Sequence, residues 1–226
     1  LKGNAASFRD AMLYNGSRFL APSLQIAMNE LDNHDHSRFL TRTNGKVGRV
    51  AQLGHQAAQE NVNKAVLREA VIMQMTWPGA PTLYYGDEAG VCGFTDPDNR
   101  RTYPWGKEDK SLIRFYKTAI AMHREYQILK TGSLKFLKEE HNLVSYARFS
   151  DEERIVVIVN NNNANISAEI PVWEAGIPRT TTSRMIQILD SNAVGFTSEK
   201  RQHLVEAGVL NIELSPLEAV VLYSGE

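Results

Sequence analysis

Seven consecutive residues, 32–38, bring together two carboxylates, two imidazoles and one guanidinium, among them Asp32, His34, Asp35 and Arg38. They follow residues 24–31, in which apolar side chains recur at every second position, a pattern that predicts a strand. Catalytic groups of a parallel barrel lie where a strand meets the following loop. Such groups can bind sugar hydroxyls or stabilise a developing positive charge. A helix cap or a solvated turn is the structural alternative, and the spacing matches no standard zinc motif.

A second cluster, residues 77–105, combines aromatic rings with charges. Tyr84 and Tyr85 precede Asp87 and Glu88, and the following loop contains residues 96–101 with Asp96 and Arg100. Rings that cover apolar sugar faces, beside charged groups that bind hydroxyls, are typical of sugar pockets. The alternative is that both tyrosines belong to a strand core and that the carboxylates cap or pair locally.

The elements that must position these clusters alternate in type. We expect helices over residues 61–76, ended by Pro78, and 110–129, with a strand over 82–85 between them. The order strand, helix, strand, helix favours parallel strands. Beyond residues 131–132 the pattern changes, and an antiparallel β-sandwich is expected from strands at 143–149, 154–160, 166–172, 184–189, 209–214 and 218–223.

Composition excludes several classes of protein. The 226 residues carry 25 Lys and Arg against 26 Asp and Glu, so no basic field exists to hold nucleic acid. No apolar run reaches the ~18 residues of a membrane span. The single cysteine, Cys92, excludes an intrachain disulfide and a multi-cysteine zinc site. Neither observation fixes a cellular compartment.

Taken together, four motifs are specific in order and spacing. They are Leu31-Asp32-Asn33-His34-Asp35, the run 78–88 from Pro78 to Glu88, the run 96–101 from Asp96 to Arg101, and Pro104-Trp105. In this arrangement the chain resembles the α-amylase family (glycoside hydrolase family 13), closest to its neopullulanase, cyclomaltodextrinase and maltogenic amylase branch. The resemblance implies that residues 1–130 are the last part of a (β/α)8 TIM barrel, from about helix 6 to helix 8. Residues 131–226 would be the β-sandwich C-terminal domain.

The resemblance also assigns roles to individual residues. Asp35 matches the third catalytic carboxylate, which stabilises the transition state of a retaining glycosidase, and His34 matches its sugar-binding neighbour. Asp96 and Arg100 match loop positions that contact the substrate. The nucleophile and the acid/base cannot be placed in this chain, which begins at Leu1 without Met. We therefore expect a piece of a longer enzyme that hydrolyses α-1,4 glucosidic bonds, inactive on its own; whether α-1,6 bonds are also cleaved stays open.

Several expectations remain open. The reaction is hydrolysis or, in related enzymes, transglycosylation, and a non-catalytic carbohydrate-binding protein or a purely structural piece are the other readings. An α-glucan or maltooligosaccharide is the expected partner, with no nucleic acid and no membrane. We expect no metal site here, although calcium is a candidate cofactor of the longer enzyme. An incomplete barrel leaves open strand edges, so the chain is expected to dimerise or pair strands in isolation.

Overall fold

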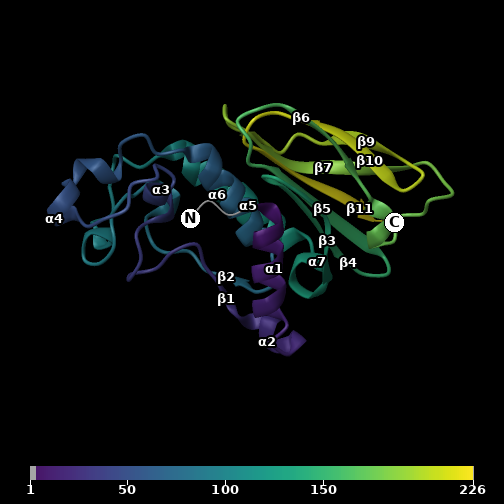
Figure 1. Ribbon diagram of the computed structural model, residues 1–226, viewed down its shortest axis with the longest axis horizontal. Helices are drawn as coiled ribbons and strands as arrows, with labels where there is room; N and C mark the ends of the chain where they lie inside the picture. Colours follow the sequence, from purple (N-terminus) through teal and green to yellow (C-terminus); the bar gives the residue numbers. More distant parts are fainter. Residues whose placement is uncertain (1–3, 226) are drawn as a thin grey trace.

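In the computed structural model, which describes residues 4–225, helices and turns fill the chain up to Gly132, and strands dominate the rest (Figure 1). The helices are α1 (Ala5–Gly16), α2 (Ala21–Ile26), α3 (Phe39–Arg42), α4 (Val50–Leu53), α5 (Lys64–Thr76), α6 (Lys110–Glu125) and α7 (Ile128–Thr131). Short 3-10 turns are η1 (Gln56–Ala58), η2 (Asp87–Ala89), η3 (Asp98–Arg100) and η4 (Val172–Ala175). None of the described helices is long and apolar enough to span a membrane.

The strands form two sheets. A parallel pair joins β1 (Met28–Asn29) to β2 (Ala80–Pro81). The large sheet has nine strands in antiparallel pairs, in the order β3-β4-β5-β11-β7-β9-β10-β6, with β8 beside β7. Its members are β3 (Ser133–Glu140), β4 (Leu143–Phe149), β5 (Glu153–Asn160), β6 (Ile166–Ile170), β7 (Ser183–Ser191), β8 (Phe196–Thr197), β9 (Arg201–Glu206), β10 (Val209–Leu214) and β11 (Glu218–Gly225).

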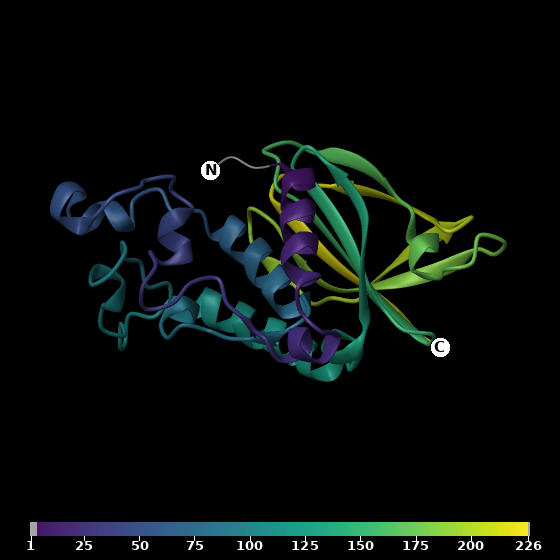
Figure 2. The same ribbon diagram turned by 60° about the horizontal axis from the view of Figure 1, so that its bottom comes forward.

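The central strands β4, β5 and β11 of the large sheet bury both of their faces. An inner core inside the curl of the sheet joins side chains of β4 and β5 to those of β6 and β10, strands that lie far apart in the sheet order. A helix-facing core on the other side unites β4, β5 and β11 with α5, α6 and α7. Figure 2 shows this curl, with the helices gathered on one side of it. Most of the described chain is therefore an all-β sheet domain, accompanied by helices that share one of its two cores.

The six strands that the sequence predicts beyond Gly132 are all present, with ends that shift by a few residues. The predicted sandwich of two sheets is wrong in one respect, because the strands belong to a single hydrogen-bonded sheet. The cause is β7, which pairs with β9 through Ser183–Gln187 and with β11 through Ile186–Ser191. Three strands, β3, β8 and β9, are missing from the prediction.

The two long helices begin where polar caps allow. The Asn63 side chain accepts hydrogen bonds from the Ala65 and Val66 amides, so α5 begins at Lys64 rather than at the predicted residue 61. Asp109 caps α6 in the same way. The predicted helix 110–129 breaks after Glu125, and a separate short helix, α7, follows.

The predicted strands of the N-terminal part are shorter than expected. Within residues 24–31 the first half is the end of α2, which begins with Pro22 in its first turn, and only Met28–Asn29 form a strand. Within residues 82–85 no strand forms, since β2 consists of Ala80–Pro81. The alternation of apolar residues at 24, 26 and 28 was therefore not a strand pattern over its whole length.

Aromatic rings and one arginine join the helices to the sheet. Trp77, which ends α5, contacts Tyr146 of β4 with ring centroids 5.1 Å apart, and Phe8 and Phe136 surround it. The fully buried Arg148 donates to the carbonyls of Thr76 and Leu129 at 2.9 and 2.8 Å, and to that of Gly132 at 2.8 Å. Carbonyls at the ends of α5 and α7 thus find their donors on the sheet, as helix C-termini require.

Candidate functional site

The parallel pair β1–β2 carries the loops of both sequence clusters. The Gln74 side chain donates to the backbone carbonyls of Asn29 and Thr82 at 2.9 and 2.8 Å. In return, the side-chain amide of Asn29 donates to the backbone carbonyl of Gln74 at 2.7 Å. Gly79 has φ +133°, and a Cβ there would lie 2.8 Å from the Ala27 carbonyl oxygen. Only glycine therefore allows this close approach of the two segments.

All four residues that the sequence singles out for the site lie together. A nitrogen of the Arg100 guanidinium lies 3.8 Å from Asp35 Oδ1 and 2.7 Å from Asp96 Oδ1. His34 Nε2 lies 3.5 Å from Asp35 Oδ1, and Arg100 Nε donates to the His34 carbonyl at 3.2 Å. Asp35 is 65% exposed and His34 67%, so both side chains are open to a ligand.

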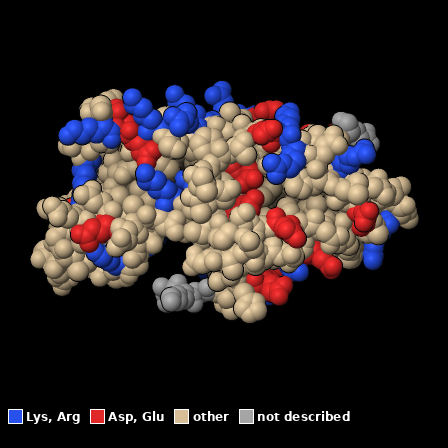
Figure 3. Space-filling view, turned by 90° about the horizontal axis from the view of Figure 1, so that it is seen from above, with Lys and Arg blue, Asp and Glu red and all other residues tan. Residues whose placement is uncertain are grey.

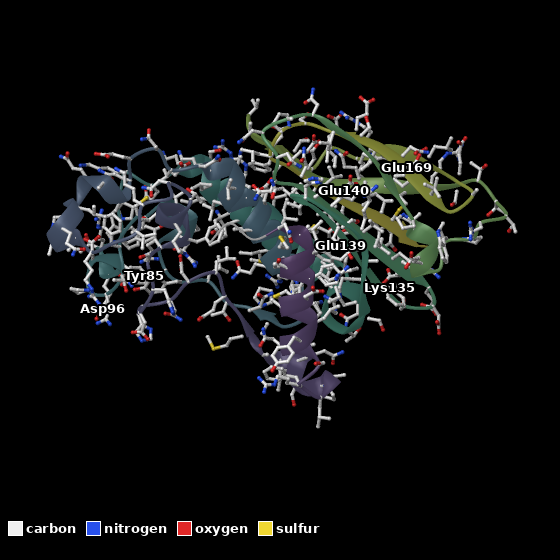
Figure 4. The ribbon with its side chains drawn as sticks, in the orientation of Figure 1. Tyr85, Asp96, Lys135, Glu139, Glu140 and Glu169 are labelled. Atoms are coloured by element: carbon white, nitrogen blue, oxygen red, sulfur yellow. The ribbon has the colours of Figure 1, made fainter. Side chains whose placement is uncertain are left out.

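This exposure bears on the reading of the motifs as mere turns and caps. That reading predicts Asp35 buried in an internal salt bridge, far from a strand end. Asp35 instead is exposed and follows β1 by six residues. Figure 4 labels Tyr85 and Asp96 at the end of the molecule away from the large sheet, whereas Glu139 and Glu169 lie over that sheet.

The backbone of the Asp35 turn is held from several sides. The Asn33 side chain accepts from the Asp35 amide at 2.9 Å, and the Thr95 hydroxyl donates to the Asp35 carbonyl at 2.7 Å. The side-chain amide of Asn99 donates to carbonyls of the same turn. Thr95 and Asn99 are residues that the sequence reasoning missed. Their position in the same loop as Asp96 and Arg100 was the only signal for them.

A buried ionic cluster lies under the site. The Arg38 guanidinium is 0% exposed and donates through Nη1 to the Asp87 carboxylate at 2.8 Å and to the Tyr85 carbonyl at 2.6 Å. It also stacks over the Tyr84 ring, 3.7 Å from the centroid. Burial, followed by the neighbouring Asp32 carboxylate, raises the pKa of Asp87 to about 8, although Arg38 opposes this. The carboxyl groups of Asp32 and Asp87 thus lie beside one buried guanidinium.

Aromatic rings stand beside the charged groups. Tyr85 is 45% exposed, and its hydroxyl donates to the Arg101 carbonyl at 2.8 Å. The predicted alternative that both tyrosines lie in a strand core is wrong, because Tyr84 is only half-buried and no strand forms there. Trp105 is 82% exposed, with its ring centroid 4.5 Å from that of Tyr103. Exposed ring faces of this kind can cover the apolar faces of sugars.

A hollow of about 470 Å³ lies on the other side of the Asp96 loop, lined by residues that include His55, Asp98 and Arg101. Asp98 forms its floor: its carboxylate accepts from Arg101 at 2.7 Å and contacts His55 Nδ1 at 2.8 Å. Burial acts to raise the pKa of Asp98, but hydrogen bonds from Arg101, the Phe94 amide and His55 outweigh it and hold that pKa below its usual value. Arg100 also lines the hollow and so separates it from Asp35.

Across residues 4–225 no three His, Cys, Asp or Glu side chains come together in an arrangement that could hold a metal ion. The charges around the site are of both signs. Figure 3 likewise shows Lys and Arg interspersed with Asp and Glu over the face it presents, in line with the formal net charge of -1. The arrangement can therefore act through hydrogen bonds and charge: carboxylates accept from hydroxyls, and Arg100 and His34 donate.

Comparisons with known proteins agree on one family. Residues 134–225 match the family described as "Alpha amylase, C-terminal all-beta domain". The chain is 30% identical over 243 residues to an amylopullulanase of Thermoanaerobacter thermohydrosulfuricus. The aligned region covers 98% of this chain and 15% of that protein. It is 35% identical over 144 residues to a cyclomaltodextrinase of a Bacillus species, covering 62% of this chain and 23% of the relative.

Solved structures show the same fold. The α-amylase of Geobacillus thermoleovorans, determined with acarbose, superposes with a TM-score of 0.74 at 21% identity, over 96% of this chain and 42% of that one. A debranching enzyme from Nostoc punctiforme gives a TM-score of 0.73 at 20% identity, over 98% of this chain and 40% of that one. The chain thus spans well under half the length of the relatives it matches.

Proposed function

The chain belongs to the α-amylase family, glycoside hydrolase family 13, and on that premise we propose that it is the rear portion of a retaining, α-glucan-active glycosidase. Residues 1–130 would be the last part of the (β/α)8 barrel, and residues 131–226 the C-terminal β-domain. The parallel pairing of β1 with β2, with α5 between them in sequence, supports this division. The names of the relatives support hydrolysis of α-glucosidic bonds.

One observation carries the proposal. Asp35 is an exposed carboxylate in the loop that follows β1, with His34 and Arg100 each within 4 Å of it. A sugar bound there would place adjacent ring hydroxyls against the Asp35 oxygens and the His34 imidazole. As positive charge develops on the sugar ring, the carboxylate stabilises it more strongly in the transition state than in the ground state.

Arg100 and Asp96 would bind the substrate beside this carboxylate. Arg100 faces the carboxylates of both Asp35 and Asp96. Its positive charge offsets their mutual repulsion, and its guanidinium offers N–H donors between them. The nucleophile and the acid/base of a retaining mechanism stand about 5–5.5 Å apart, and no pair of residues in this chain is assigned to those roles.

The test uses the longer protein that contains this chain. Wild type is expected to release reducing sugar from maltooligosaccharides, and Asp35→Asn should lower kcat by about 10²–10³-fold, a magnitude typical of one lost electrostatic stabiliser. Asp151→Asn, an exposed carboxylate in the turn between β4 and β5, is the matched control. A folded longer protein without activity on any α-glucoside contradicts the proposal.

The same experiment separates the other readings. Glucan chains longer than the substrate among the products would point to transglycosylation. Tight binding of maltose by calorimetry without any bond cleavage would favour a non-catalytic carbohydrate-binding protein. The 226-residue chain alone is expected to be inactive.

A further inference from the structure

A buried amide lies directly behind the turn that carries His34 and Asp35. Asn99 is 0% exposed, and its Nδ2 lies 2.6 Å from the His36 carbonyl oxygen and 3.0 Å from that of His34. A third, longer contact of 3.5 Å reaches the Asn33 carbonyl. A side-chain amide has two N–H donors, so both are used on carbonyls that flank Asp35.

Asn99 is itself fixed in place by its surroundings. Its backbone carbonyl accepts from Arg38 Nε at 2.9 Å. The Gly93 segment presses against it: a Cβ at Gly93 would lie 2.7 Å from Asn99 Cα and 2.6 Å from the Asp98 carbonyl oxygen. Gly93 in turn accepts from the Arg38 amide at 2.9 Å. Arg38 and Gly93 together therefore hold the buried Asn99 end of the loop in place.

The exposed end of the same short turn reaches the ligand side. Arg100 follows Asn99 directly, donates through Nε to the His34 carbonyl at 3.2 Å and faces the Asp35 carboxylate. One 3-10 turn, η3, thus sets the position of Asp35 from behind and that of its guanidinium partner from the front. A displacement of Asn99 would move both groups.

A role in packing alone does not explain this residue. The Oδ1 atom of Asn99 is buried and has no hydrogen-bond partner among residues 4–225. An unpaired buried amide oxygen is destabilising, and an apolar side chain of the same shape would avoid that cost. What favours Asn99 over an apolar side chain at this position is therefore the pair of hydrogen bonds that its Nδ2 donates to the His34 and His36 carbonyls.

We infer that Asn99 is a positioning residue, which orients the Asp35 carboxylate relative to Arg100 through the carbonyls of His34 and His36. It does not touch the substrate, because its side chain is fully buried. The inference rests on the proposed function for its effect on turnover. Its structural half, the fixing of the turn, stands independently of any activity.

The first measurement needs no activity. Hydrogen exchange of the amides of residues 33–36 is followed in this chain for wild type and Asn99→Leu. The variant should exchange at least about tenfold faster there, because local opening becomes less costly. Asn160→Leu is the matched control: Asn160 is also 0% exposed and donates to two carbonyls, but it lies in β5. Unchanged exchange over residues 33–36 in Asn99→Leu would overturn the inference.

The second measurement uses the longer protein. Asn99→Leu should lower kcat by about 10–100-fold with little change in KM, as expected when a reacting group is displaced by about 1 Å. Gly93→Ala displaces the 98–99 backbone without removing any group from the site, so it should reproduce both effects, and it serves where Asn99→Leu fails to fold. Faster exchange with an unchanged kcat would overturn the catalytic half. An inactive wild type contradicts the proposed function instead, and the exchange result still decides the structural half.

Discussion

The fully buried guanidinium of Arg38 donates to the carboxylate of Asp87 at 2.8 Å, under the turn that carries the candidate site. The Asp87 side chain is only 12% exposed, so solvent screens this pair little. Asp32 is near enough to raise the pKa of Asp87, so the three side chains form one cluster. Loss of the cation would leave two carboxyl groups in a buried place without a countercharge.

The first prediction concerns that cluster. Arg38→Met should lower the free energy of unfolding by about 3–5 kcal/mol, the usual cost of removing one partner of a buried ion pair. Urea titration followed by circular dichroism measures it. Lys46→Met, which removes a half-exposed partner of Glu60, should cost less than about 1 kcal/mol. An equal loss in the free energy of unfolding for Arg38→Met and Lys46→Met would contradict the importance of the buried Arg38–Asp87 pair.

A second prediction concerns pH. Burial raises the pKa of Glu69 to about 8 from its ordinary 4.5, although Arg68 opposes the shift. Between these values the folded chain keeps a proton that the unfolded chain has released. The free energy of unfolding therefore falls as pH rises toward 8, by at most about 1.4 kcal/mol per pH unit for this group.

Glu69→Gln isolates that contribution. The variant should show a shallower fall in the free energy of unfolding between about pH 5 and pH 8 than wild type. Glu125→Gln removes an exposed carboxylate of α6 and controls for the change in net charge. Identical slopes for wild type and Glu69→Gln would show that Glu69 is ionised in the folded chain.

Arg148 should be a stability determinant at the junction of helices and sheet. Arg148→Met leaves the carbonyls of Thr76, Leu129 and Gly132 without their donor, so we expect a loss of at least about 3 kcal/mol in the free energy of unfolding. Burial lowers the pKa of Arg148 to about 10, which leaves it charged at neutral pH. Arg184→Met, on an exposed position of β7, should change stability by less than about 0.5 kcal/mol in the same denaturant titration.

The binding role of Arg100 predicts a kinetic signature in the longer protein. Arg100→Met should raise KM for maltooligosaccharides about tenfold and lower kcat less, because it removes one charge-assisted hydrogen bond to the substrate. Arg114→Met on the exposed face of α6 is the control. An unchanged KM would remove Arg100 from the substrate contacts.

Self-association of the 226-residue chain is the last prediction. Apolar side chains of α1, the connection between α1 and α2, α2 and β1 are exposed close together in sequence: Leu13 50%, Phe19 52%, Leu20 78%, Ile26 77% and Met28 68%. Surfaces of this kind associate in water. Light scattering should show a mass that rises with protein concentration, and a Phe19→Ser/Leu20→Ser double variant should weaken the rise. A constant monomer mass over the series would refute it.

Sequence patterns predicted the large sheet well because its central strands are apolar on both faces. β5 contains the apolar run Ile-Val-Val-Ile-Val and β11 the run Ala-Val-Val-Leu, so their strand character does not depend on an alternation of apolar and polar residues. β3 escaped prediction because four of its eight residues are charged, as is common at a sheet edge. β9 escaped for a similar reason, with only Leu204 and Val205 as apolar residues.

The parallel pair was harder to predict because its ladder is short. The backbone amides of Ala80 and Thr82 donate to the Ala27 and Asn29 carbonyls, and beyond this point the Thr82 carbonyl accepts from the Gln74 side chain instead of from a strand. The candidate site itself was predicted through the resemblance, which linked Asp35 to Asp96 and Arg100 over a separation that no local pattern bridges. Asn99 and Arg38 could not be assigned from local patterns, since their contacts exist only in the folded chain.

The burial of Trp77 among Phe8, Phe136 and Tyr146 has an optical consequence. Of the chain's three tryptophans, Trp77 is 9% exposed, Trp173 39% and Trp105 82%. Acrylamide should therefore quench the emission of Trp105 and Trp173, while Trp77 keeps a blue-shifted, protected fluorescence. The fraction of fluorescence that acrylamide does not quench therefore reports, without an added label, whether the helices remain packed against the sheet.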